Sequence, residues 1–186
     1  MPEAVSVGVW HWSVRLGHWA LAVSVLTCLW LYEGGGWHEG LGYAALALAS
    51  WRLLLGGCSR RPQLRFDRFV RGPRATLAYA RALLRGKEPR HLGHNPLGGW
   101  MIVLLLATAL VAGASGALYA TDRLWGDAGV HRWHQVSGWL LAVLVLGHLL
   151  GVVLTSLLQR ENLVQAMFSG RKRAPQAGDS DVGGSA

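Results

Sequence analysis

The chain has 186 residues, of which 52% are hydrophobic and only 15% are charged, whereas a soluble domain carries about 25% charged residues. Its formal net charge of +8 would also suit a nucleic-acid-binding protein. The basic residues, however, flank long uncharged stretches, which is the pattern of a membrane protein whose loops hold the charge. Composition therefore excludes an ordinary soluble domain, and we expect a lipid membrane and no nucleic acid as the surroundings of this chain.

Four apolar segments, in chain order, are long enough to cross a membrane. We expect these spans at about residues 14–32, 37–57, 97–120 and 130–158. About 20 helical residues cross a hydrocarbon core of about 30 Å, and helices are required because lipid offers no partner to free backbone groups. The predicted fold class is all-α: an integral membrane four-helix bundle in one domain of residues 1–175. A disordered tail rich in Gly, Ser and Asp is expected over 176–186.

The link between the second and third spans carries most of the positive charge. It contains ten Lys or Arg residues against two acids, and its segment from Arg74 to Arg85 is expected to form a short basic helix on the membrane surface. The positive-inside rule places this link in the cytoplasm, and with four spans both termini are then cytoplasmic. The first loop has acidic residues and no Lys or Arg, which agrees with an outside position.

Two histidines of the fourth span are the sharpest feature of the sequence. His134 and His148 are 14 residues apart, so at about 100° and 1.5 Å per residue they share a helix face and lie about 21 Å apart along the axis. They cannot bind one metal ion together, but each could hold one of two stacked cofactors. The predicted topology puts His38 at the depth of His134 and His18 at the depth of His148.

Two His–His pairs at two depths suit two six-coordinate haems, each with an imidazole on both axial positions. Such haems keep no open site for oxygen or substrate, which favours electron transfer. A lone intramembrane histidine more often hydrogen bonds to a neighbouring helix, and His131 and His11 are weaker rivals for the ligand positions of His134 and His18. A zinc transporter would want carboxylates on turns next to the histidines, and the apolar interiors of the spans carry none.

Other residues near the proposed ligands support the same hypothesis. Arg15 and Arg52 lie near the inner level, where a haem propionate is a natural partner, although snorkelling to the surface is the alternative. Glycines could leave room for a flat porphyrin, or they could serve only helix packing. They are Gly17, Gly42, Gly138, Gly147 and Gly151.

Several stretches resemble the bacterial cytochrome b561-like family, in particular the b-type cytochrome subunits of nickel–iron hydrogenases. They are VRLGHWALA around His18, WHEGLGYAALALASWRLL from Trp37, GHNPLGGWM from Gly93 and ENLVQAMFSGRKR from Glu161, together with the spacing of His134 and His148. The resemblance implies a membrane cytochrome b domain holding two haems b, paired as His18–His148 and His38–His134. It also implies a bacterial inner membrane location.

The resemblance further implies electron exchange between quinone and a periplasmic partner, either a hydrogenase or a c-type cytochrome. His94 and Asn95, in the GHNPLG stretch, are expected either to help form a quinone site or to cap the third span. Whether the chain is itself an enzyme stays open, and we expect an electron-transfer subunit of a quinone-linked oxidoreductase. The alternatives are a quinone reductase that uses a small diffusible reductant, and a haem-free membrane anchor.

Overall fold

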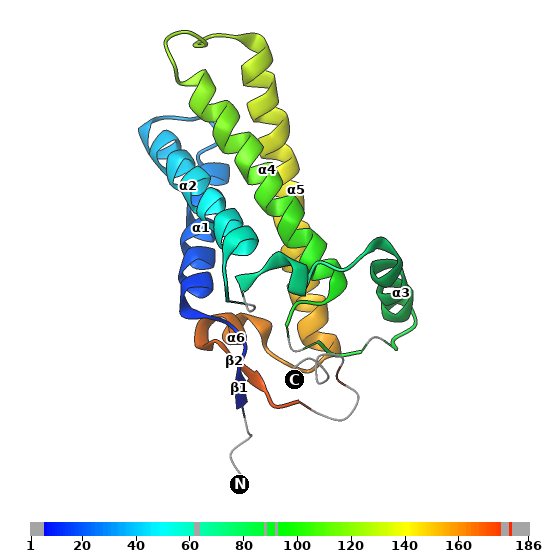
Figure 1. The fold of residues 1–186 in the computed structure, drawn as a ribbon. Coiled ribbons are helices and arrows are strands. Elements are labelled where there is room, and N and C mark those ends of the chain that lie inside the picture. The colour runs from blue at the N-terminus through cyan, green and yellow to red at the C-terminus, as the bar shows by residue number, and fades with distance from the viewer. Residues whose placement is uncertain (1–5, 62–63, 88, 92, 176–178, 180–186) are drawn as a thin grey trace.

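A computed structural model describes residues 6–61, 64–87, 89–91, 93–175 and 179. Four of its helices are long and apolar enough to cross a membrane, as Figure 1 shows. They are α1 (Trp12–Trp30), α2 (Gly36–Cys58), α4 (Pro96–Tyr119) and α5 (Ala128–Leu158). The predicted fold class, an all-α membrane bundle of four spans, is confirmed.

Local chemistry explains where these helices begin. The side chain of Asn95 accepts a hydrogen bond from Gly98 N at 2.7 Å, and Pro96 occupies the first turn of α4. Asp127 caps α5 in the same way through Val130 N at 2.9 Å. Such caps satisfy backbone N–H groups that have no partner inside the helix. The turn between α1 and α2 contains Gly34 and Gly35, both at positive φ, a conformation that side chains disfavour.

The bundle packs through small residues. Its core joins Val25, Ala45, Ala49, Leu106, Ala109 and Leu141. Gly113 of α4 lies so close to α2 that a Cβ there would be 2.9 Å from Leu46 Cβ. Small residues let membrane helices approach closely, since lipid supplies no hydrophobic drive between them. The large side chains of α5 are mostly exposed, among them Val143, Leu146 and Leu157, as expected for a surface that faces lipid.

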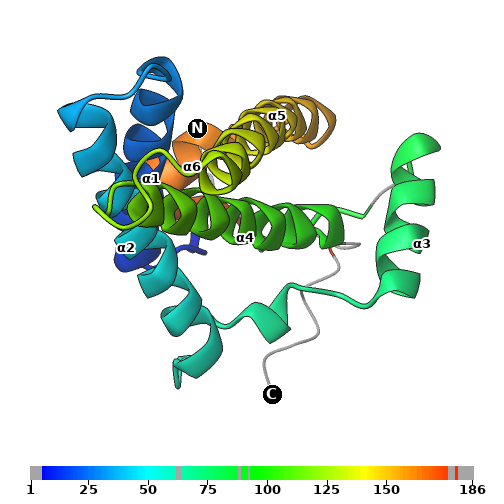
Figure 2. The ribbon, with the colours of Figure 1, turned by 90° about the horizontal axis from the view of Figure 1, so that it is seen from above.

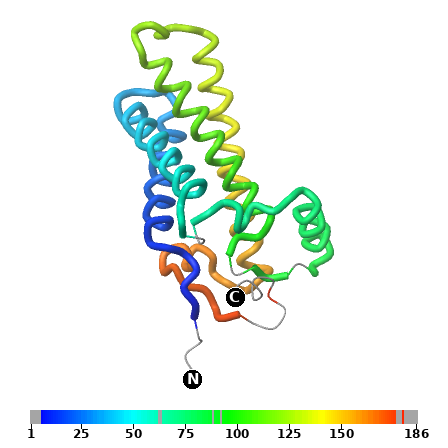
Figure 3. Tube along the Cα trace, viewed as in Figure 1, coloured from blue at the N-terminus to red at the C-terminus, as the bar shows by residue number. Residues whose placement is uncertain are grey.

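One end of the bundle carries a small additional module. It comprises the short strands β1 (Ser6–Gly8) and β2 (Arg171–Arg173), the 3₁₀ turn Phe66–Arg68, α3 (Pro73–Leu84) and α6 (Leu163–Ser169). β1 and β2 pair antiparallel, with Val7 opposite Lys172. Figures 1 and 3 show α6 and β2 below the start of α1, so segments from both ends of the chain meet there.

The module was only partly predicted. The expected basic helix is present as α3, whereas the β1–β2 ribbon and α6 were not foreseen. Arg90 connects the basic link to the C-terminal segments, because its guanidinium donates to Glu161 at 2.9 Å and to Asp179 at 2.6 Å. The three residues are half-buried, and their side chains are only 7–9% exposed. Apart from Asp179, the tail expected to be disordered lies outside the described residues.

Candidate cofactor-binding site

The structure brings the four predicted histidines together as two pairs. The rings of His38 on α2 and His134 on α5 have centres 5.8 Å apart. Those of His18 on α1 and His148 on α5 have centres 6.2 Å apart. Each pair therefore joins α5 to a different helix, and the two pairs lie at different levels of the bundle.

The ring separations fit two imidazoles that bind one metal from opposite sides. A metal–imidazole bond is about 2.0–2.1 Å, and a ring centre lies about 1 Å beyond its nitrogen. Two such ligands then have ring centres about 6 Å apart. Both measured separations lie near this value, so the four side chains fit two haem irons, each with two imidazole ligands.

Hydrogen bonds orient the outer pair. The Nδ1 of His134 lies 2.9 Å from Ala112 O, and the Nδ1 of His38 lies 3.1 Å from Cys28 O. A carbonyl can only accept, so Nδ1 carries the proton in both rings and Nε2 keeps a free lone pair. A ligating histidine is commonly held in this way, with its other nitrogen donating to a carbonyl.

The inner pair is positioned by packing. Among the described residues, neither His18 nor His148 makes a side-chain hydrogen bond. His18 contacts its neighbour Trp19, whose ring also stacks on Phe168 of α6 at 4.2 Å. The Nε1 of Trp19 is buried and finds no hydrogen-bond partner in the described part of the chain. A buried donor without a partner is costly, and a carboxylate of a bound cofactor would satisfy it.

The rival histidines have other partners. The Nδ1 of His11 accepts from Ser13 N at the start of α1, and its Nε2 lies 2.9 Å from Arg61 Nη1. The ring of His131 lies 5.0 Å from that of Tyr119 and is exposed. Neither ring faces another histidine across the bundle, so the geometry favours His18 and His134 as the paired residues.

Three of the five predicted glycines leave space beside the histidine pairs. A Cβ at Gly42, Gly138 or Gly151 would meet nothing within 4 Å, and one at Gly147 would meet only Met101 Cε, at 3.5 Å. Gly17 differs, because a Cβ there would lie 2.5 Å from the Trp51 ring. Gly17 thus serves the packing of α1 on α2, whereas the others fit a flat group beside the helices.

The two predicted arginines lie at the inner end. Arg15 Nε donates to Met167 O at 3.1 Å. Arg52 Nη1 donates to Leu64 O at 3.2 Å, and its guanidinium lies over the Phe66 ring. These bonds use few of the five N–H donors of each guanidinium, so both side chains keep donors for an anionic group.

His94 is a further residue of this end, and it lies outside the spans. Its ring packs between Trp10, at 4.4 Å, and Phe69, at 4.6 Å. Burial, together with the positive charges of Lys172 and Arg52, lowers the pKa of His94 to about 3. The ring is therefore neutral at physiological pH. Of the two roles expected for His94 and Asn95, the structure gives Asn95 the helix cap.

Sequence reasoning missed two residues of this end. Trp19 could have been singled out as the direct neighbour of His18. Lys172 is buried by the β1–β2 pairing and donates to His91 O at 3.4 Å, which no local pattern predicts.

Among the described residues, no carboxylate joins either histidine pair. Glu39, which follows His38 in the first turn of α2, is exposed. In the described part of the chain, no three His, Cys, Asp or Glu residues form a group that could hold a metal ion. Each pair thus offers two ligands, and a macrocycle would have to supply the remaining ones.

Known cytochromes resemble this chain in sequence. Residues 9–170 match the family model described as prokaryotic cytochrome b561. Curated relatives named "Probable Ni/Fe-hydrogenase B-type cytochrome subunit" are 32% identical over 103 residues in Azotobacter vinelandii and 25% identical over 107 residues in Cupriavidus necator.

These alignments cover 45% and 48% of this chain and 43% and 44% of the two relatives. The matched part of the chain thus spans less than half the length of these relatives. No solved structure matches the chain.

Proposed function

This chain belongs to the prokaryotic cytochrome b561 family, and we propose that it carries electrons across the membrane on two b haems, one held by each histidine pair. The general function follows from the family and the four spans. The chain is a multi-pass bacterial membrane cytochrome that binds haem b and transfers electrons. The number of haems, their ligands and the redox partners belong to the proposal.

The observation that carries the proposal is the matched spacing of the two ring pairs, 6.2 Å and 5.8 Å between centres. Two independent pairs at the separation of opposed axial ligands, both completed by α5, are what two stacked cofactors require. Haem supplies reversible one-electron transfer when bound. The chain would contribute the axial nitrogens, the orientation of the rings and an apolar enclosure.

The residues around each pair would tune the two sites differently. At the outer site, the carbonyls of Cys28 and Ala112 hold the imidazoles of His38 and His134 and would fix the orientation of their Nε2 atoms. At the inner site, Arg15, Arg52 and the Trp19 indole would neutralise or hydrogen bond the carboxylates of the cofactor. The pairs would lie about 21 Å apart along α5, enough to cover most of the membrane core.

The partners proposed are quinone and an external redox protein. The names of the curated relatives point to a hydrogenase, with a periplasmic c-type cytochrome as the other choice. The basic link, α3 and β1–β2 lie at one end of the bundle, so the positive-inside rule would place both termini in the cytoplasm and the outer pair near the periplasm. The membrane would then be the inner membrane.

Haem content and a reduced-minus-oxidised spectrum of the purified chain test the proposal. We expect two haems b per chain, about one after His134→Ala or His148→Ala, and none after both changes together. His131→Ala is the matched control, because it removes an exposed histidine of the same helix that has no histidine partner.

Three outcomes would contradict the two-haem assignment. They are a chain without haem, a chain that holds only one haem and loses it through either change, and an equal loss of haem through His131→Ala. Oxidation of the reduced protein by a soluble quinone analogue, followed at the haem bands, tests the quinone separately.

A further inference from the structure

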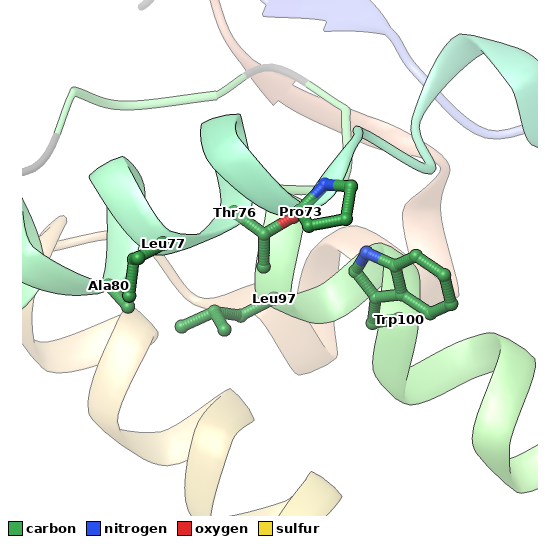
Figure 4. A pocket seen from close by; sticks show the side chains of 6 residues that line it. All are labelled: Pro73, Thr76, Leu77, Ala80, Leu97 and Trp100. Carbon is green, nitrogen blue, oxygen red and sulfur yellow. The ribbon is translucent and has the colours of Figure 1, made fainter.

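Helix α3 leaves the bundle and forms a groove with the start of α4. Figures 1 and 2 show it beside the end of the bundle that carries β1 and β2, running across the direction of α5. The groove measures about 410 Å³. Figure 4 shows its lining, which is Pro73, Thr76, Leu77 and Ala80 of α3 and Leu97 and Trp100 of α4.

The depth of the groove places it where lipid headgroups meet acyl chains. Leu97 and Trp100 belong to the first turns of α4, so they lie within about one turn, or 5 Å, of the start of this span. Surface helices bury their apolar face about 5–10 Å into this boundary. Trp100 is held there, since its Nε1 donates to Arg71 O at 3.0 Å.

The lining of the groove is apolar and open. The single hydroxyl, on Thr76, bonds to the carbonyls of Gly72 and Arg71 and makes no demand on a ligand. Leu77 is 51% exposed, and Leu84, about two turns further along the same face of α3, is 88% exposed. Leucines this open at the level of the membrane surface indicate contact with hydrocarbon.

A basic stripe runs beside this apolar side of α3. Arg74, Arg81 and Arg85 fall within about 40° of one another around the helix, and Arg81 lies about 40° from Leu77. All three arginines are exposed, and none forms an ion pair within the described part of the chain. Arg81 and Arg85 are four residues apart, so their guanidinium groups can reach one anion.

We propose that the α3–α4 groove binds an anionic phospholipid, with an acyl chain along Leu77, Ala80 and Leu97 and the phosphate at Arg81 and Arg85. The apolar lining and its depth select a lipid tail, and the unpaired arginines beside it select a negative headgroup. The lipid would hold α3 against α4, where the protein itself provides few large contacts.

Native mass spectrometry of the full haem-loaded chain in detergent tests the site, with phosphatidylglycerol and phosphatidylcholine of identical acyl chains as probes. We expect one phosphatidylglycerol per chain, bound at least tenfold more tightly than phosphatidylcholine. Because each basic residue at an anionic surface strengthens binding about fivefold, Arg81→Gln with Arg85→Gln should weaken phosphatidylglycerol binding by at least tenfold. Ala80→Phe, which fills the groove, should prevent it.

Two matched controls separate the site from general charge and from misfolding. Arg60→Gln with Arg171→Gln removes the same charge from exposed residues outside α3, and Ala75→Phe adds the same ring to an exposed position of α3. Both should bind phosphatidylglycerol as the unchanged chain does. Haem per chain shows that each variant is folded.

The proposal would be overturned if Arg60→Gln with Arg171→Gln weakened phosphatidylglycerol binding as much as Arg81→Gln with Arg85→Gln. Equal affinity for phosphatidylglycerol and phosphatidylcholine would overturn it as well. A dimer that Ala80→Phe dissociates would overturn it too, because the groove would then be an interface between two copies of the chain.

Discussion

At the scale of single residues, the two nitrogens of each imidazole have separate tasks. At the outer pair, Nδ1 donates to a main-chain carbonyl, which leaves Nε2 as the nitrogen that would bind iron in the proposed site. At the inner pair, packing replaces those bonds, and the indole of Trp19 has a buried N–H that finds no partner among the described residues. The sequence predicts which histidines can pair, since only spacing and depth are needed. It cannot predict the carbonyl partners, because these depend on how α1, α2 and α4 cross.

His94 gives the protein an acid-sensitive contact. Its pKa falls from the ordinary 6.5 to about 3 because the folded protein buries the ring. The unfolded chain therefore takes up a proton first as the pH falls below 6.5, and the stability gained from the neutral ring is lost between about pH 6.5 and 3.

We expect the melting temperature to fall between pH 7 and 5, and the fall to be smaller in His94→Phe, which keeps a ring between Trp10 and Phe69. Thermal unfolding across this pH range measures the effect. His131→Phe, at an exposed ring, should leave the pH profile unchanged. An identical fall in both variants would show that His94 is not responsible.

At the scale of elements, close contact between α4 and α5 positions the outer pair. A Cβ at Gly116 of α4 would lie 3.0 Å from Cε1 and 3.1 Å from Nδ1 of His134. The ring has little freedom to yield, since its Nδ1 is bonded to Ala112 O of the same helix. Glycine at this position therefore allows the ring to reach both α4 and His38.

Gly116→Val should displace the His134 ring and lower the haem content towards one per chain, with a stability cost of about 1–3 kcal/mol for overpacking. Gly57→Val is the control, because a Cβ at Gly57 meets nothing within 4 Å. Haem quantification and the spectrum report the result. Two haems in the Gly116→Val protein would show that this contact does not position the ligand.

The elements differed in how far the sequence predicted them. The spans follow from hydropathy and length, because lipid allows few alternatives to a helix. α3 follows from its basic, amphipathic pattern. The strands β1 and β2 have three residues each and pair residues more than 160 positions apart, and α6 has only seven residues. Elements this short carry little periodic signal, and long-range pairing leaves none in the local sequence.

At the scale of the whole molecule, one ionic cluster joins the basic link, the segment between α5 and α6, and the tail. Arg90 donates to Glu161 and Asp179, and Glu161 also accepts from Arg173 N at 2.9 Å. Burial acts to raise the pKa of Glu161, but the hydrogen bonds from Arg90 and Arg173 outweigh it and hold this pKa below its ordinary value. The cluster is therefore ionised at neutral pH and weakens as acid protonates Glu161.

Glu161→Gln should destabilise the end of the bundle that carries β1 and β2 by about 2–4 kcal/mol. The positive charge of Arg90, whose side chain is largely shielded from solvent, would then have only the Asp179 carboxylate among the described residues to neutralise it. We expect faster hydrogen exchange in β1, β2 and α6, with the centres of α4 and α5 unchanged. Asp67→Asn is the control, because its pair with Arg65 is exposed and worth little. Equal exchange in both variants would argue against a role of the cluster in holding the module.

The amino-acid sequence by itself determined the membrane class, the four spans and the four histidines that can form two pairs. These depend on hydropathy, helix period and charge, all of which are local or additive along the chain. Only the tertiary structure decided that the ring centres lie about 6 Å apart and which carbonyls hold His38 and His134. It also decided that the Trp19 N–H, the His94 ring and Lys172 are buried at the inner end. Those features arise where segments distant in the sequence meet, and no local pattern encodes that meeting.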